Sequence, residues 1–201
     1  MSLAVLSLCL LQACFLFRTE PKVQVPDPAL LRPEIAMSEE FIRSKPGDLL
    51  AFLPKGWFLV DVEGKMSSDV LAVAVNPDYT LSMVVQTLRS DDLLQQTVAR
   101  EGLIGLARAA FDKRARKTAN GVRLLSPMDK LDYGTKHFGT YDFSIDATDS
   151  TAQRSRSVVL TSSLGNFYEV CLVPTPVTTA KTPEEDDMRK IFHSIVVSLQ
   201  F

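Results

Sequence analysis

The sequence predicts an α+β domain, in which an antiparallel β-sheet of about six strands is packed by a long central helix and a C-terminal helix. Segments typical of β-strands, joined by short turns, occupy both halves of the chain, and short turns join antiparallel neighbours. Between these segments, residues 90–117 have the longest helical pattern, and a second helical pattern closes the chain.

Length and composition are those of one globular domain with a short extension. The 201 residues are 46% hydrophobic and 23% charged, so the chain can bury one sizeable core. The formal net charge is −2, whereas a nucleic-acid-binding domain is usually strongly basic. We therefore expect no nucleic-acid partner.

Residues 1–17 are an apolar stretch without a charged side chain. The apolar run is shorter than the roughly 20 residues that span a bilayer as a helix, and it is typical of a signal-peptide core. Within it, Leu11-Gln12-Ala13-Cys14 resembles the lipobox of bacterial lipoproteins, which implies a lipid attached to Cys14. The alternatives are an uncleaved hydrophobic anchor, a mis-assigned start codon or a cytoplasmic protein.

The predicted organisation is therefore an anchor, a linker and one domain. Residues 18–36 contain four prolines among polar residues, which predicts an extended linker. Residues 37–201 form the α+β domain. It contains a single cysteine, Cys171, so a disulfide framework is excluded. We expect a location in the bacterial cell envelope, with the domain held at a membrane by the lipid and facing the periplasm or the exterior.

The first half of the domain is predicted to contain a short helix and three strands. Ser38 and the two glutamates after it are typical of a helix start, which predicts a helix over residues 38–42. Periodicity leaves residues 48–53 open between a helical turn and an edge strand. Strands are predicted over residues 57–62, 70–75 and 81–87, and the second of these is apolar on both faces and therefore central.

The long helix at residues 90–117 begins with two aspartates and ends in a basic run. Gly102 and Gly105 lie inside it, and each costs about 1 kcal/mol relative to alanine. The two glycines indicate either close packing against the sheet or a break in the helix. We expect this helix to lie across the sheet as its packing spine.

The second half is predicted to contain further strands and the C-terminal helix. Pro183 is expected at the first helical position, followed by acidic residues in the first turn. The strands are predicted over residues 122–125, 134–147, 156–162 and 167–173. The buried face of the helix is predicted to consist of Met188, Ile191, Phe192, Ile195, Val196 and Leu199.

Four short motifs in these elements occur together in a known fold family. They are Pro54-Lys55-Gly56-Trp57 before a strand, the strand at residues 134–145, the hairpin at residues 164–173, and the closing pattern of Ile195, Ser198 and Phe201. Together they resemble the PsbP/Mog1/DcrB-like fold family over residues 50–201. The resemblance implies an α/β/α sandwich with a binding or accessory role, often exported or lipid-anchored. It implies no shared catalytic centre, so it transfers no site residues.

Residues that could act in catalysis do not form a recognised motif. Cys171 lies in an apolar strand, where a cysteine usually belongs to the core. His137 is expected to be partly buried at the start of a strand, and His193 to be exposed on the last helix. The sequence contains no nucleophile elbow and no nucleotide-binding or calcium-binding loop. We predict no enzyme activity and no cofactor.

Two pairs of carboxylates each lie on one face of a predicted strand, because their members are an even number of residues apart. The pairs are Asp61 with Glu63 and Asp142 with Asp146. Such pairs either lie on a solvated face of the sheet or form a weak site for a divalent cation. We favour the solvated face and predict no metal site.

The basic run at the end of the long helix has two interpretations. Positive charge at a helix C-terminus is stabilised by the helix dipole, and we favour this explanation. The alternative is a contact patch for lipid headgroups or for a partner protein. The residues concerned are Lys113, Arg114, Arg116 and Lys117.

These observations predict a non-catalytic, lipid-anchored envelope protein that binds an unidentified partner protein or assists an assembly. The alternative is a small-ligand carrier or a hydrolase with a pocket between the sheet and the long helix. A deep pocket containing His137 and several aspartates would favour that alternative, and a filled core would count against it.

Overall fold

The structure is a computed structural model, and it describes most of the predicted domain. Cys14, Glu63 and Asp146 lie outside the described residues, so the predicted lipid attachment and one member of each carboxylate pair have no structural account. Within the described part, no helix is long and apolar enough to cross a membrane. The described residues are 31–61, 64, 66–118, 121–145, 153–175 and 181–201.

The large sheet is built from eight strands: β3 (Phe58–Val60), β4 (Val70–Val75), β5 (Leu81–Leu88), β6 (Arg123–Leu124), β7 (Asp129–Tyr133), β8 (Lys136–Ser144), β9 (Ser155–Thr161) and β10 (Phe167–Pro174). Their order is β3-β4-β5-β10-β9-β8-β6, and β7 also pairs with β8. Every pair is antiparallel, which confirms the predicted class. The number of strands exceeds the prediction, and β4 lies next to the edge instead of at the centre.

The helix predicted over residues 38–42 is wrong, because these residues form a strand. Strand β1 (Met37–Arg43) pairs antiparallel with β2 (Leu50–Pro54), which also resolves the open alternative at residues 48–53. The Ser38 hydroxyl accepts a hydrogen bond from the Glu40 amide within β1, in the stretch where the register with β2 shifts. Burial of Ile42 in the core outweighs the local capping signal.

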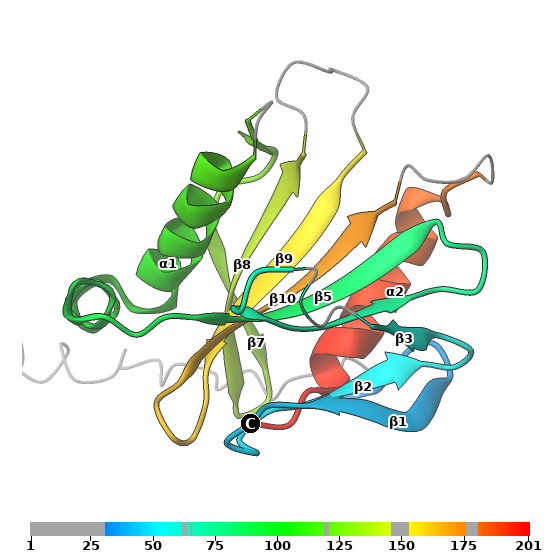
Figure 1. Cartoon of the computed structure of the whole chain (residues 1–201), viewed down its shortest axis with the longest axis horizontal. Coiled ribbons are helices and arrows are strands. Elements are labelled where there is room, and N and C mark those ends of the chain that lie inside the picture. Colours follow the sequence, from blue (N-terminus) through cyan, green and yellow to red (C-terminus); the bar gives the residue numbers. More distant parts are fainter. Residues whose placement is uncertain (1–30, 62–63, 65, 119–120, 146–152, 176–180) are drawn as a thin grey trace, which may run out of the picture.

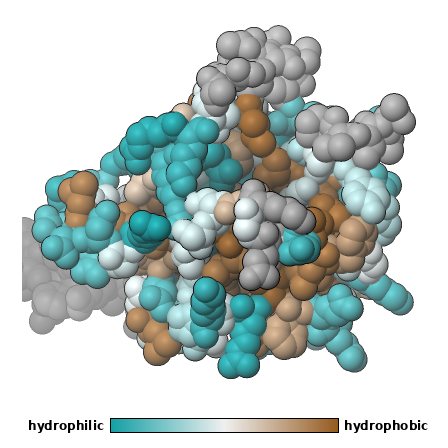
Figure 2. Space-filling view, in the orientation of Figure 1, coloured by the Kyte–Doolittle hydropathy of each residue, from teal (hydrophilic) through white to brown (hydrophobic). Residues whose placement is uncertain are grey.

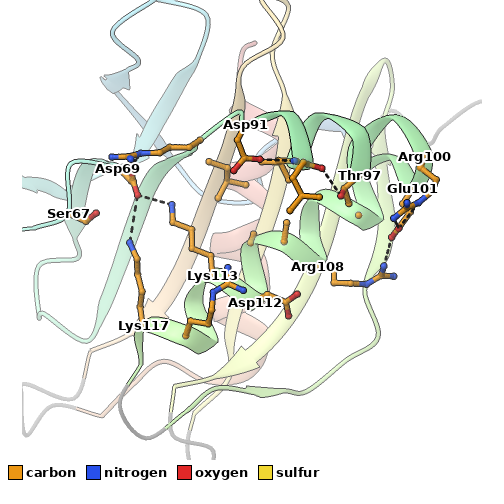
Figure 3. Close-up of a pocket in the computed structure, with 18 residues that line it drawn as sticks. Ser67, Asp69, Asp91, Thr97, Arg100, Glu101, Arg108, Asp112, Lys113 and Lys117 are labelled. Atoms are coloured by element: carbon orange, nitrogen blue, oxygen red, sulfur yellow. Dashed lines mark hydrogen bonds and ion pairs between the residues drawn. The ribbon is translucent and has the colours of Figure 1, made fainter.

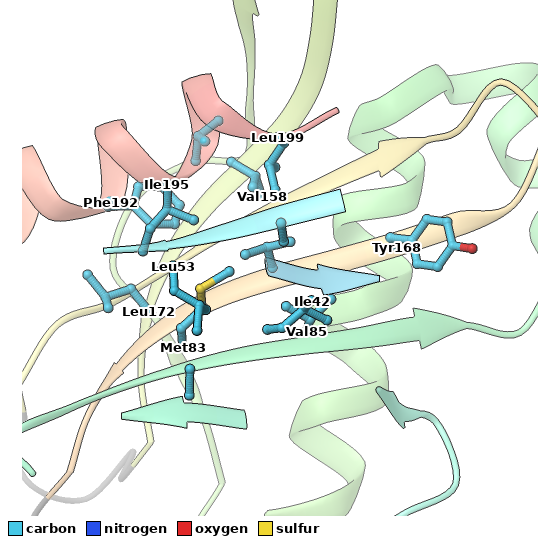
Figure 4. Packing of buried hydrophobic residues seen from close by; sticks show 14 of the residues in the cluster. Ile42, Leu53, Met83, Val85, Val158, Tyr168, Leu172, Phe192, Ile195 and Leu199 are labelled. Atoms are coloured by element: carbon cyan, nitrogen blue, oxygen red, sulfur yellow. The ribbon is translucent and has the colours of Figure 1, made fainter. Parts of the chain in front are cut away.

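One face of the sheet is covered by the β1–β2 hairpin and by α2 (Glu185–Ser198) (Figure 1). Figure 4 shows Phe192 and Ile195 of α2 close to Leu53 of β2. Five residues of the predicted helix face are buried and Ile191 is partly buried, as expected. Pro183 is not the first helical position, because Glu184 after it is still extended. The first turn carries acidic residues, as predicted.

The opposite face is covered by α1 (Asp92–Lys117) (Figure 1). At Gly102 the backbone is not helical, with φ 63° and ψ −148°, so α1 consists of a first segment (residues 92–101) and a second segment (residues 103–117). Only glycine adopts this conformation readily. The prediction of a break is therefore confirmed at Gly102.

The second segment of α1 provides the packing against the sheet. Leu106, Ala107 and Ala110 are buried against residues that include Tyr141 and Phe143 of β8. The closest approach is at a glycine of the strand: a Cβ atom on Gly139 would lie 2.4 Å from the carbonyl oxygen of Leu103. The expected packing spine is thus the second segment alone.

Candidate functional site

A cleft of about 680 Å³ opens in the bend of α1 (Figure 3). Both segments of the helix line it, together with Ser67 and Asp69 before β4 and Leu88 and Arg89 at the end of β5. Its apolar lining includes Leu88 and Ala110, which are buried, and Leu94 and Ala109, which are partly exposed. Leu93 at its margin is 73% exposed.

The bend is held by contacts between the two segments. A Cβ atom on Gly105 would lie 3.1 Å from the Thr97 carbonyl oxygen and 2.8 Å from the Glu101 Cβ, so Gly105 lets the segments approach. The first segment is capped by Asp91, whose carboxylate accepts from the Leu94 amide at 2.8 Å. Glycine is therefore needed twice here, for the turn and for the close approach.

At one end of the cleft, three cations surround one carboxylate. Asp69 Oδ2 lies 2.9 Å from Lys113 Nζ and 3.7 Å from Lys117 Nζ, and Asp69 Oδ1 lies 3.2 Å from Arg89 Nε. The hydrogen bond from Lys113 is the main cause that lowers the pKa of Asp69. One carboxylate cannot neutralise three cations, so this end of the cleft carries a net positive charge.

At the other end, Glu101 forms ion pairs with Arg100, at 2.6 Å, and with Arg108 (Figure 3). These arginines lower the pKa of Glu101, with the hydrogen bond from Arg100 as the largest cause. Including the residues between the two ends, the lining contains six basic and four acidic side chains. The cleft is thus positive on balance in a chain whose formal net charge is −2.

Three residues of the predicted basic patch line this cleft, and the fourth does not. Lys113, Arg116 and Lys117 face the cleft. Arg116 is exposed and has no ion-pair partner among the residues that the structure describes. Arg114 points toward the sheet, where its guanidinium lies 4.5 Å from the centre of the Phe143 ring and 2.8 Å from Glu169 Oε1.

Glu169 is fully buried in β10 beneath α1, and sequence reasoning missed it. It accepts hydrogen bonds from Tyr141, at 2.5 Å, and from Ser157, at 2.7 Å. Burial acts to raise the pKa of Glu169, but the charge of Arg114 and these hydrogen bonds lower it to about 2. A single charge in an otherwise apolar strand was the signal that could have identified this network.

Cys171 belongs to the same network. Its side chain is fully buried, with Sγ 3.1 Å from Glu169 Oε1 and 2.9 Å from Arg114 Nη2. Burial is the main cause that raises the pKa of the thiol, so Cys171 stays protonated near neutral pH. A buried thiol of this kind is unreactive, in keeping with the structural role expected for it.

A second buried carboxylate, Asp48, connects the two sheets and was also missed. Ser44, beside it in the β1–β2 turn, donates to its carboxylate, and so do Ser162, Asn166 and Tyr168 of the β9–β10 hairpin. Burial alone would raise the pKa of Asp48, but these four hydrogen bonds lower it. The network anchors the β1–β2 hairpin, and none of its residues lines the cleft.

Both predictions for the histidines are wrong, and neither histidine lines the cleft. The His137 side chain is 64% exposed and hydrogen-bonds to Asp132 at 2.7 Å. His193 is buried, with Nδ1 3.0 Å from Glu34 Oε1. It is covered because the segment that contains Glu34 is attached to α2 through a hydrogen bond from the Glu34 amide to the Ser194 hydroxyl.

Only one member of each predicted carboxylate pair, Asp61 and Asp142, belongs to the described residues. Asp61 is exposed, as expected for a solvated face. Asp142 instead lies largely out of solvent, 3.5 Å from both Arg154 and Arg156, and burial raises its pKa. Among the described residues, no group of three or more His, Cys, Asp or Glu side chains is arranged to hold a metal ion.

The predicted pocket between the sheet and the long helix is filled. Leu106 and Phe111 of the second segment pack there against Tyr141 and Phe143. A second cavity, of about 520 Å³, lies beside α2 and includes Glu34, Arg156 and His193 in its lining. The larger cleft, in the bend of α1, combines an apolar floor with two charged ends.

No family model and no curated protein matches this sequence. Among solved structures, cyanobacterial PsbP from Synechocystis matches with 17% identity and a TM-score of 0.51, over 80% of this chain and 91% of that chain. The yeast Ran-binding protein Mog1p, from Saccharomyces cerevisiae, matches with 15% identity and a TM-score of 0.47, over 82% of this chain and 96% of that chain. The chain therefore has the PsbP/Mog1-like α+β fold that its motifs predicted.

Proposed function

We propose that this chain is a non-catalytic, lipid-anchored protein of the bacterial cell envelope that binds a partner protein through the cleft in the bend of α1. The observation that carries the proposal is the cleft itself, with its apolar floor, its charged ends and the exposed Leu93 at its margin. An apolar centre with a polar rim is the usual composition of a protein-binding surface.

The anchor supplies the location. Leu11-Gln12-Ala13-Cys14 would direct a lipid to Cys14, and residues 18–36 would connect it to the domain. Acyl chains contribute about 0.8 kcal/mol per buried CH₂ group, so several together hold a domain at a membrane. Cys14→Ser should abolish fatty-acid labelling and release the chain from membranes. Unchanged labelling and membrane association would disprove the anchor.

Partner binding is tested by site-specific crosslinking in the cell, because a photoreactive residue reports contacts at one position. Leu93, at the cleft, is 73% exposed, and Leu164, in the β9–β10 turn, is 66% exposed, so the two positions form a matched pair. We expect a discrete crosslinked partner from position 93 and none from position 164. Mass spectrometry of the crosslinked band then identifies that partner.

If the cleft is the binding surface, partner binding also requires the bend of α1 at Gly102. Alanine at position 102 disfavours the backbone conformation of the bend, while a Cβ there would meet no other atom within 4 Å. Gly102→Ala should therefore remove the crosslink from position 93 and leave the cooperative unfolding of the sheet intact. Equal crosslinking from both positions, or a crosslink that survives Gly102→Ala, would refute the cleft as the binding surface.

A further inference from the structure

The two charged ends of the cleft and its apolar floor also indicate the chemistry of the occupant. We propose that the cleft accepts an acidic, amphipathic segment of a partner protein, which carries carboxylates toward both ends and apolar side chains between them. This inference rests on the proposed function and describes its partner.

The electrostatic argument comes from the distribution of the ion pairs. Three cations share Asp69 at one end, and two arginines share Glu101 at the other, so each end retains positive charge after its internal pairing. Figure 3 shows these groups on opposite sides of the cleft. Incoming carboxylates would be attracted at both ends, and partly buried charge pairs of this kind favour association and set the orientation.

The apolar argument comes from the floor between these ends. Leu94 and Ala109 line it from the two segments of α1, above the buried Leu88. In Figure 2, hydrophilic side chains predominate over α1, with a small hydrophobic patch over its first segment. Apolar side chains of the occupant would remove this floor and Leu93 from water, which is favourable in proportion to the area buried.

The shape favours a protein segment over a lipid headgroup. A bilayer presents its anionic groups on an even surface, whereas here the cations lie at two separated ends of a recessed apolar floor. A segment with charges at its ends and apolar residues in the middle matches this arrangement.

The test uses two synthetic peptides of about twelve residues. One has glutamates at both ends and leucine and alanine in the middle, and the other replaces each glutamate with lysine. Each peptide carries a fluorophore and is titrated, by anisotropy, with the full-length chain in phosphatidylcholine nanodiscs. We expect the acidic peptide to bind, the basic peptide not to bind, and the binding to weaken as the salt concentration rises.

Matched charge variants assign the binding to the cleft. Arg116→Glu with Lys117→Glu reverses two exposed charges of the cleft, and we expect affinity for the acidic peptide to fall about tenfold. Lys45→Glu with Lys55→Glu makes the same change in net charge at exposed positions outside the cleft, and should leave the affinity unchanged. Ala109→Trp, which fills the floor, should abolish binding while the circular-dichroism spectrum stays native.

Several outcomes would overturn the acidic segment as the occupant. They are equal binding of the two peptides, binding of neither, or an equal loss of affinity in the two charge variants. Phosphatidylglycerol nanodiscs that suppress peptide binding, with lipid crosslinked from position 93, would assign the cleft to headgroups instead. If a cellular partner still crosslinks from position 93 while the acidic peptide fails, partner binding stands and only the proposed chemistry of the segment is lost.

Discussion

The two sides of the second segment of α1 use neighbouring basic residues in opposite ways. Arg114 faces the sheet, with its side chain 18% exposed, and pairs with the fully buried Glu169. Lys117, three residues later, is 57% exposed and lies on the cleft side near Asp69. A buried ion pair depends on both partners for stability, whereas an exposed one contributes little and remains available to a ligand.

The comparison also separates two kinds of contact within one basic run, one buried against the sheet and one exposed in the cleft. The helix-dipole interpretation does not by itself account for either side, because Arg114, Lys113 and Lys117 have specific carboxylate partners in other elements. The buried side holds α1 to the sheet. The exposed side places positive charge in the cleft.

The largest effect is expected from breaking the buried side. Arg114→Ala leaves Glu169 without its cation, and truncating one partner of a buried pair costs about 3–5 kcal/mol. Urea unfolding, followed through the fluorescence of the buried Trp57, measures the loss. The double variant Arg114→Met with Glu169→Gln should recover part of it, because no charge is left unpaired and the amide oxygen can still accept from Tyr141 and Ser157. A loss below about 1 kcal/mol in Arg114→Ala would show that the pair is not a buried structural contact.

A smaller loss is expected where the same side meets the backbone of the sheet. Gly139→Ala places a Cβ atom 2.4 Å from the Leu103 carbonyl oxygen, so the helix must move away, at a cost of about 2–3 kcal/mol. Thr140→Ala, the next residue, loses only the hydrogen bond from the Thr140 hydroxyl to the Ser157 carbonyl and should cost about 1 kcal/mol. Urea unfolding of the Gly139→Ala and Thr140→Ala variants measures the two losses of stability. Equal losses would mean that the close approach of α1 is not required.

Acid should weaken the fold through its two buried carboxylates, Glu169 and Asp48. The pKa of Glu169 is about 2 in the folded chain, below its ordinary value, and that of Asp48 is also lowered. The unfolded state therefore binds more protons, so stability is full above about pH 5 and falls as the pH drops toward 2. We expect a loss on the order of 2 kcal/mol from Glu169 alone across this window.

Urea midpoints measured between pH 6 and pH 2.5 follow this acid dependence. Asp48→Asn should be less stable than the parent chain at pH 6, with a smaller further loss on acidification, because one of the two carboxylates no longer titrates. A stability that stays constant over this range would contradict the lowered pKa values of both groups.

The smallest effect is expected on the exposed side. Lys117→Ala removes a side chain that is more than half exposed and lies 3.7 Å from Asp69, and should cost less than about 1 kcal/mol. The contrast with Arg114→Ala, measured by the same unfolding experiment, is the sharpest test of the comparison. A loss in Lys117→Ala as large as that in Arg114→Ala would mean that the cleft side is also part of the structural core.

Much of the fold followed from local pattern. The antiparallel strands from β4 to β5 and from β9 to β10, and the buried face of α2, have the periods that alternation and helical geometry require. Of the candidate cleft, only the basic run was identified from the sequence, because a cluster of like charges is visible without a partner. Asp69, Arg89 and Glu101, which complete the cleft, carry no such local signal.

The sequence by itself thus determined the fold class and the C-terminal helix, since each depends on residues close together in the chain. It also marked the two glycines of the long helix as a close approach or a break, and the structure decided for a break at Gly102. The tertiary structure alone decided that residues 38–42 form a strand, that His193 is buried, and that Arg114 turns inward while Lys113 and Lys117 turn outward. Those outcomes depend on partners distant in the chain, such as Glu34, Asp69 and Glu169. Local periodicity records which side of an element is buried, and it does not record which distant group will face that side.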